Sequence, residues 1–402
     1  MTDVMGADEM AGTTAPGQEE TARGKVITFY SYKGGTGRTM SLANTAWILA
    51  SGGKRVLVVD WDLDAPGLDR FLHPFLDRDR LRTAQGIIDL FLHFNQTVRE
   101  QRKAPDPHTQ DEWETAEAEW VATQAHFNHC VIPIDWEFPG GGRLDYVSPG
   151  TQNKEYLSAY SQFDWMHFLD HSWHGPVFVQ ALKHELTQNY DYVLIDSRTG
   201  LSDLSDVCTV LLPDVLVVAF TPSSQGMDGA QAVAQKIDSL YGYRGIRIIP
   251  VPMRVEDANG EADRLEAARE QMRAKFADIV RRHCPLDAQE YWGKVEIPYR
   301  PFYAYEELLA PFRDAPGSPT SLLSACERLT DVISEGEVTA LPRLDDAERK
   351  RVLALYKRPR PLENTTIHVS FVPEDRTWAD WIEFTLKSVG FQVRLLSNGT
   401  TT

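Results

Sequence analysis

Short, nearly unbroken runs of apolar residues recur along the chain and predict buried β-strands. They occupy residues 25–31, 55–60, 192–196, 215–220 and 246–251. Apolar runs of this length are typical of strands that are covered on both faces of a parallel sheet. Helical patterns lie between them, at residues 40–51, 229–240 and 261–283. This alternation predicts an α/β fold, a doubly wound and mostly parallel sheet.

A long stretch separates the second predicted strand from the third. It contains about 130 residues, far more than a single crossover connection needs. The stretch is rich in Trp, His and Glu, notably at residues 111–120. We expect a mostly helical insertion at about residues 95–185, with one strand near residues 144–147.

The C-terminal part of the chain has a different pattern. Residues 336–362 are charged and contain Pro, which predicts a linker with one helix at residues 345–357. Strands are predicted at residues 367–371 and 391–395, and a helix at 378–388, so residues 363–402 form a βαβ unit. A lone βαβ unit buries little surface, and we therefore expect the truncated opening of a larger domain.

Composition narrows the class of protein. The chain is 42% hydrophobic and 25% charged, as in ordinary globular proteins. Its net charge of −17 disfavours non-specific binding to nucleic acids or anionic membranes. Four widely spaced cysteines argue against a disulfide scaffold and fit a reducing cytosol. Residues 1–24 lack a signal peptide's basic and apolar regions, so we expect a disordered tail on a cytoplasmic protein.

A Gly-rich segment between the first strand and the first helix is typical of a phosphate-binding loop. Residues 32–39 read Tyr-Lys-Gly-Gly-Thr-Gly-Arg-Thr. Glycines let backbone amides approach phosphate oxygens, and the helix that follows adds its N-terminal dipole. A Gly-rich turn without ligand is the alternative, but Lys, Arg and Thr at fixed offsets favour nucleotide binding. The predicted nucleotide contacts are Lys33, Gly34, Gly35, Thr36, Gly37, Arg38, Thr39 and Met40.

Acidic residues end two later strands. Asp60, Asp62 and Asp64 follow the second strand, and Asp196 ends the third. Ligands of such sheets bind beyond the carboxyl ends of the strands, so these carboxylates would face the phosphates. A solvated acidic loop is the plainer alternative. We expect Asp64 to be a turn residue and Arg198 to be an exposed structural arginine.

Lys33 at the start of the loop makes it resemble the deviant Walker A motif of the MinD/ParA superfamily of ATPases. The whole string is similar to the KGGVGR-motif variant of that superfamily, across residues 25–335. The resemblance implies a P-loop NTPase domain, ATP and Mg²⁺ as cofactors, and a nucleotide-dependent homodimer in which Lys33 reaches the partner's phosphates. It implies that Asp62 orients the attacking water. The metal site would use Thr39, Asp196 through a water, and Asp60 behind the direct ligands.

Arg38 replaces the usual terminal lysine of this loop. Its planar guanidinium is bulkier than the ammonium that lies along the β- and γ-phosphates, so binding should survive better than turnover. Two functions follow: a slowly hydrolysing dimerisation switch with Lys33, Arg38 and Asp62 as catalytic residues, or a non-hydrolysing scaffold. A ParA-like role on DNA is a third, which the net charge disfavours.

The resemblance also places the adenine base near the ends of later strands. Pro252, Met253 and Arg254 are therefore candidate base contacts, with loop packing as the alternative. Residues 197–200 would form a switch that senses the γ-phosphate.

Two weaker signals have plain explanations. His167, His171 and His174 recur at helical spacing, so we expect them to share a helix face, packed rather than metal-binding. The basic cluster at residues 349–360 suggests membrane contact, but a solvated linker helix is favoured.

Residues 367–381 resemble the first strand and helix of a TIR domain, with a generic flavodoxin-like βαβ unit as the alternative. The resemblance implies protein partners through the C-terminal region, in a bacterial multidomain signalling or defence-type protein. TIR domains that cleave NAD⁺ depend on a glutamate on a later helix. Glu374 and Glu383 do not occupy that position, so we expect no NADase activity from this segment.

Overall fold

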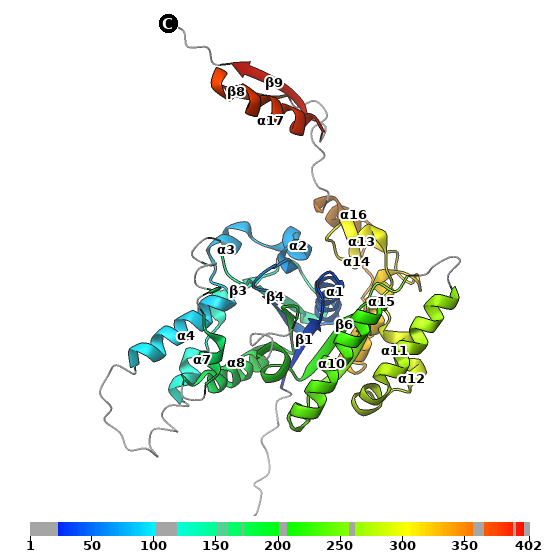
Figure 1. Cartoon of the computed structure of the whole chain (residues 1–402). Coiled ribbons are helices and arrows are strands. Elements are labelled where there is room, and N and C mark those ends of the chain that lie inside the picture. The colour runs from blue at the N-terminus through cyan, green and yellow to red at the C-terminus, as the bar shows by residue number, and fades with distance from the viewer. Residues whose placement is uncertain are drawn as a thin grey trace, which may run out of the picture. The chain divides into compact units, whose positions relative to one another are not determined.

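A computed structural model describes residues 23–101, 119–151, 153, 156, 160–161, 163–170, 173–200, 207–256, 262–356, 366–388 and 391–397. The chain divides into two compact units. The first runs to Pro342 without residues 311–313, and the second comprises residues 311–313 and the chain from Arg343 onward. Figure 1 shows the elements of both.

Seven strands of the first unit form one sheet in the order β3-β4-β2-β5-β1-β6-β7. Every neighbouring pair is parallel except β3 with β4, which is antiparallel. The strands are β1 (Lys25–Ser31), β2 (Arg55–Trp61), β3 (Val131–Pro133), β4 (Arg143–Val147), β5 (Tyr192–Ser197), β6 (Val215–Phe220) and β7 (Arg247–Pro252). The α/β, mostly parallel sheet predicted from the apolar runs is confirmed.

The region predicted as a helical insertion also contributes to this sheet, and the strand predicted near residues 144–147 is confirmed as β4. β4 pairs directly with β2, and β3 extends the edge beyond it. β3 was not predicted, because three residues that end in a proline give almost no strand signal. Of the acidic segment 111–120, only its last two residues lie within the described part of the chain.

Helices cover the sheet of the first unit. They are α1 (Arg38–Ser51), α2 (Leu68–Leu72), α3 (Arg78–Thr83), α4 (Ile87–Gln101), α7 (Trp165–Leu169), α8 (Gly175–Asn189), α10 (Ser224–Tyr241), α11 (Ala262–His283), α12 (Ala288–Val295), α13 (Pro301–Tyr305), α14 (Ala310–Arg313, across the unit boundary) and α15 (Leu322–Ser334). Shorter segments are η1 (His73–Phe75), η2 (Asn128–Cys130), η3 (Pro139–Gly141), η5 (Val207–Leu211) and η6 (Gly242–Arg244).

The two faces of the sheet have different cores. Val26, Leu57, Val193 and their neighbours on the same face pack against α4, α7 and α8, where Phe91 and Phe178 meet edge to face. On the other face α1 packs against β1, β2, β4 and β5 and is covered by α15. Apolar side chains on both faces explain why these strands read as unbroken apolar runs.

The strand order brings the predicted motifs to one edge. β5 lies between β1 and β2, so the loop after β1 is next to the carboxyl ends of both acidic strands. Asp196 is in register with Phe29 of β1 on one side and with Asp60 of β2 on the other. Crevices at such reversals of strand order are where open α/β sheets bind ligands.

The second unit holds α16 (Asp346–Leu355), β8 (Thr366–Phe371), η7 (Pro373–Asp375), α17 (Arg376–Ser388) and β9 (Gln392–Ser397). β8 and β9 pair in parallel, as the predicted βαβ unit requires. Trp378, Trp381 and Phe384, spaced three residues apart on α17, are all exposed. The basic cluster is only partly described: Arg351 lies near Glu348 on α16, while residues 357–360 lie outside the described residues.

Two further expectations need correction. Arg23 and Gly24, placed in the disordered tail, bond to Thr187 at the end of α8. The three histidines do not share a helix: α7 ends at Leu169, His174 has left-handed backbone angles before α8, and His171 lies outside the described residues. Across the described ranges, no helix is long and apolar enough to cross a membrane.

Candidate functional site

The loop between β1 and α1 has the backbone that a phosphate site requires. Gly35 and Gly37 have positive φ angles of 70° and 97°, which other residues rarely adopt. Gly37 is the N-cap of α1 and has no side chain with which to cap it. The first-turn amides of α1 are thus left to a ligand, and the helix dipole favours an anion there.

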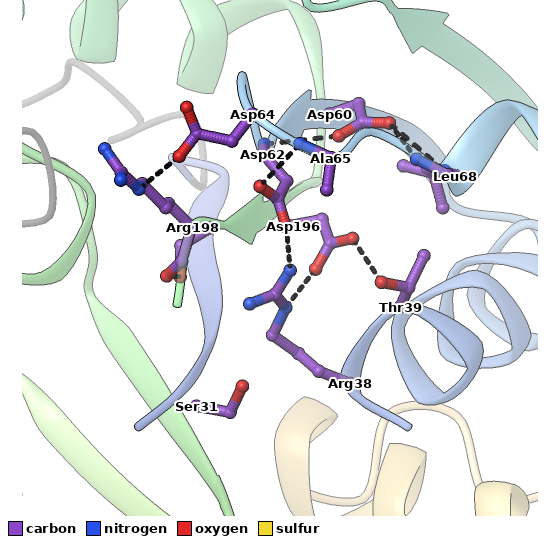
Figure 2. Close-up of polar contacts among 12 residues, drawn as sticks. Ser31, Arg38, Thr39, Asp60, Asp62, Asp64, Ala65, Leu68, Asp196 and Arg198 are labelled. Atoms are coloured by element: carbon purple, nitrogen blue, oxygen red, sulfur yellow. Dashed lines mark hydrogen bonds and ion pairs between the residues drawn. The ribbon is translucent and has the colours of Figure 1, made fainter. Parts of the chain in front are cut away.

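Arg38 and Thr39 converge on one carboxylate at the centre of the site, as Figure 2 shows. The Arg38 Nε donates to Asp196 Oδ1 at 2.5 Å, and Thr39 Oγ1 donates to Asp196 Oδ2 at 2.6 Å. The Arg38 Nη2 also donates to Asp62 Oδ2 at 3.0 Å. The guanidinium therefore bridges the acids that end two neighbouring strands.

Burial makes this bridge electrostatically strong. The side chains of Arg38 and Asp196 are 6% and 1% exposed, and that of Asp62 is 14% exposed. Burial opposes the charge on Arg38, but the charges of Asp196 and Asp62 outweigh it, and the pKa of Arg38 is raised. Burial raises the pKa of Asp62 despite the opposing charge of Arg38.

Asp60 holds the loop that follows β2. It is fully buried, and its carboxylate accepts bonds from the backbone amides of Asp62, Gly67 and Leu68. Burial, followed by the charge of Asp196, raises its pKa well above the ordinary range. Asp60 thus shapes the loop that presents Asp62, because all three of these hydrogen bonds come from backbone amides of that loop.

Asp64 and Arg198 pair with each other across the rim of the site. The Arg198 Nε lies 2.6 Å from Asp64 Oδ2, and its Nη1 donates to the Tyr160 hydroxyl at 3.0 Å. Burial, then the hydrogen bond with Asp64, raises the pKa of Tyr160 to about 12. Sequence reasoning treated the two charged residues separately, because nothing local links positions so far apart in the chain.

Lys33 lies at the start of the loop, next to α10. Its Nζ donates to Gln225 Oε1, from the start of α10, in a contact exposed to solvent. A hydrogen bond to a neutral, exposed amide holds a lysine weakly, so Lys33 is available to a phosphate. Gln225 carried no sequence signal as a site residue.

A cavity of about 930 Å³ opens over the phosphate loop. Besides the loop it is lined by Asp62, Arg198, Arg254, Tyr299 and Tyr303. Of the three candidate base contacts only Arg254 lines it; its guanidinium lies 5.8 Å from the ring centre of Tyr299.

Pro252 and Met253 are buried, which disagrees with their prediction as base contacts. Pro252 is the last residue of β7, and the methyl group of Met253 would lie 3.2 Å from a Cβ placed on Gly37. Met253 thus packs behind the phosphate loop, while the carbonyl of Pro252 accepts a hydrogen bond from Ile297 N, and both arrangements agree with the packing alternative.

The oxygen donors present suit Mg²⁺. Thr39 and Asp196 offer a hydroxyl and a carboxylate, the hard ligands that Mg²⁺ takes in small number alongside phosphate oxygens and water. Within the described ranges, no group of three or more His, Cys, Asp or Glu side chains could hold a metal by itself. A site of this kind fits Mg²⁺ that arrives with a nucleotide.

Two comparisons with known proteins match short segments of this chain, one of which includes the phosphate loop. Residues 24–66 match the family model of the AAA domain. Over 49 residues the chain is 47% identical to an uncharacterized ATP-binding protein of Methanocaldococcus jannaschii. That match covers 12% of this chain and 19% of the relative, so the chain spans about a fifth of the length of the curated relative it matches.

Solved structures with a similar arrangement include cell-division and partition ATPases. The Pyrococcus furiosus cell division ATPase MinD is 19% identical with a TM-score of 0.45, covering 78% of this chain and 99% of that chain. The structure of pNOB8 ParA bound to nonspecific DNA is 17% identical with a TM-score of 0.42, covering 82% and 99%. Similarity this low assigns no function, and the fold described above rests on strand order and register alone.

Proposed function

We propose that this chain is a MinD/ParA-like P-loop ATPase that binds ATP with Mg²⁺ and acts as a nucleotide-dependent dimerisation switch. One observation carries the proposal: Arg38 and Thr39, from the end of the phosphate loop, meet Asp196 beneath an open cavity. Loop amides, two cations and a carboxylate at a reversal of strand order make a site for a nucleoside triphosphate.

Each residue has a distinct task in this proposal. The loop amides and Lys33 bind phosphates, with Lys33 reaching those of a partner copy. Thr39 and Asp196 hold the Mg²⁺, which when bound neutralises charge on the phosphate oxygens. Asp62 orients the attacking water, and Asp60 fixes the loop that carries Asp62.

Arg38 has a double task. It neutralises Asp62 and Asp196 in the nucleotide-free chain, and it provides positive charge for the phosphates when ATP binds. Both carboxylates compete with phosphate for one guanidinium, so Arg38 must leave at least one of them. Breaking an Arg38–carboxylate contact costs free energy before ATP can be hydrolysed, and this supports slow turnover.

The same observation favours a second candidate, a scaffold that binds nucleotide without hydrolysing it. If Arg38 stays on Asp62, that carboxylate cannot orient a water. The C-terminal unit, which we propose to resemble a TIR-type interaction domain, would then transmit only nucleotide binding to protein partners. We propose a cytoplasmic location for either function.

Nucleotide binding and phosphate release separate the candidates. We expect ATP to bind the full chain in isothermal titration calorimetry, more weakly after addition of EDTA. The switch predicts phosphate release that Asp62→Ala abolishes, and ATP-dependent dimers in size-exclusion chromatography that Lys33→Ala prevents.

Asp278→Ala is a matched control, because Asp278 is an exposed acid paired with Arg281 on α11. Phosphate release that is absent in wild type, with ATP binding intact, selects the scaffold. Absence of ATP binding refutes both candidates.

A further inference from the structure

A second cleft, of about 470 Å³, lies beside the nucleotide cavity. Pro298 and Arg300 line both spaces, so the segment at residues 297–300 forms a wall between them. The motifs and proposed function described above leave this cleft unexplained. Its lining includes four arginines: Arg269, Arg273, Arg300 and Arg328.

The four guanidinium groups are unequally neutralised. Arg269 is held by Glu296, with its Nη2 2.8 Å from Oε2, and Arg273 Nη1 lies 3.2 Å from Glu266 Oε1. Arg300 and Arg328 have no carboxylate partner among the described residues.

Both of these arginines donate hydrogen bonds to backbone carbonyls. Arg300 donates to the carbonyl oxygen of Thr320, and Arg328 Nη1 donates to that of Pro319 at 3.4 Å. The Arg328 Nε is buried with no hydrogen-bond partner in the described structure. A neutral carbonyl does not offset the positive charge of a guanidinium, and it leaves most of the five N–H donors without an acceptor.

The charge balance of the cleft opposes that of the whole chain. Four arginines line it against two carboxylates, Glu256 and Glu296, whereas the chain carries a net charge of −17. Concentrating like charges costs free energy unless an anion offsets them. Planar guanidinium forks match the oxygens of phosphate groups, and the cleft volume is that of a small-molecule site.

We propose that this cleft binds a small anion that carries phosphoryl or pyrophosphoryl groups, at a site separate from the phosphate loop. Arg273, Arg300 and Arg328 supply its charge-assisted hydrogen bonds. The site does not depend on the ATPase activity proposed above.

The wall between the two spaces links them mechanically. Val255 N donates to Ile297 O at 3.1 Å, and Tyr299 N donates to Val255 O at 2.9 Å, so the wall pairs with the chain just after β7. Arg254, Tyr299 and Arg300 from these two paired segments line the nucleotide cavity. An anion that draws Arg300 toward the second cleft therefore changes the lining of the first.

Inorganic pyrophosphate is the probe, titrated into the full chain by calorimetry without nucleotide. We expect two sites in wild type, one at the phosphate loop and one in the cleft. Arg273→Gln/Arg328→Gln should weaken pyrophosphate binding in the cleft about tenfold or more, because the variant loses two guanidinium groups that donate charge-assisted hydrogen bonds. Lys33→Ala should weaken only pyrophosphate binding at the phosphate loop. Arg281→Gln is the control, since Arg281 lies on α11 like Arg273 but does not line the cleft.

Each outcome decides the proposal. Pyrophosphate binding that responds to Lys33→Ala and not to the double variant overturns the cleft site and leaves the ATPase proposal intact. Binding lost only in the double variant supports the cleft and counts against the phosphate loop. A short DNA duplex that binds through the same arginines where pyrophosphate does not would also overturn the proposal. The single Arg328→Gln variant repeats the test should the double variant fail to fold.

Discussion

Removal of Arg38 is the perturbation that tests the central bridge most directly. Arg38→Ala leaves Asp62 and Asp196 facing each other without a cation, and both are buried or nearly so. Breaking a buried ion pair by removing one partner costs about 3–5 kcal/mol, because the remaining charge is neither paired nor solvated. We therefore expect the nucleotide-free Arg38→Ala chain to lose about 3–5 kcal/mol of unfolding free energy at neutral pH.

Protonation of Asp62 or Asp196 would limit this loss of stability and make it depend on pH. A carboxylate left without its cation can take up a proton, and each unit of pKa change is worth about 1.4 kcal/mol. The destabilisation by Arg38→Ala should therefore shrink as pH falls from 7.5 toward 5. Replacing Asp196 by Asn in the same chain should recover part of the loss, because it removes one of the orphaned charges.

Urea unfolding followed by tryptophan fluorescence, without nucleotide, measures both effects. Arg281→Ala is the matched control: its partner Asp278 lies three residues away on α11 and both side chains are more than 70% exposed. We expect that exposed pair to contribute less than about 1 kcal/mol. A loss of below about 1 kcal/mol for Arg38→Ala as well would refute the reasoning, since it would equate the bridge with a surface pair.

Three further predictions concern other parts of the first unit. A hydrogen bond from Lys25 lowers the pKa of Glu335, so its carboxylate stabilises the fold above its unfolded pKa of about 4.3 and loses this effect as pH falls through the lower folded pKa. Glu335→Gln should therefore lower urea stability at pH 7 and have little effect below about pH 4; an equal loss at both would contradict this. Gly229→Ala would place a Cβ 2.2 Å from the Tyr32 ring, so we expect weaker ATP binding, whereas Gly242→Ala, with open space around it, should match wild type in calorimetry. ADP should also protect the chain against urea less when EDTA is present, and identical protection would argue against a bound metal.

The sequence was sufficient for the elements whose side chains follow one simple pattern. β1, β2, β5, β6 and β7 are buried on both faces, and their apolar runs located them to within a residue or so. β3 has three residues and pairs only with β4. An apolar run of three residues is too common along any chain to predict a strand. The histidine spacing failed for a related reason: periodicity cannot reveal that Asp164 caps a helix of five residues or that His174 takes left-handed backbone angles before α8.

The types of the site residues could be predicted from the sequence, but the contacts that position them could not. Asp60 and Asp62 are two residues apart, and both looked suited to face the phosphates. Three backbone amides that return to Asp60 from the following loop decide which of them is structural. Those bonds depend on how residues 62–68 fold back over the strand end, which no local pattern encodes. The same holds for Met253, whose burial depends on the packing of α1.

The identity of residue 38 gains its meaning only from the strand order. Asp62 directly follows β2 and Asp196 lies in β5, and these two strands are neighbours although far apart in sequence. A lysine ammonium is one compact charge, whereas a guanidinium presents separate donors in a planar fork and can bind two carboxylates at once. Nε and Nη2 of Arg38 do so here, one to each acid. The substitution that makes the loop unusual therefore ties the phosphate loop to both acidic strands. A ligand that withdraws Arg38 from both acids breaks its contacts with Asp62 and Asp196 together, so a nucleotide bound in this way would act directly on the loop that carries Asp62.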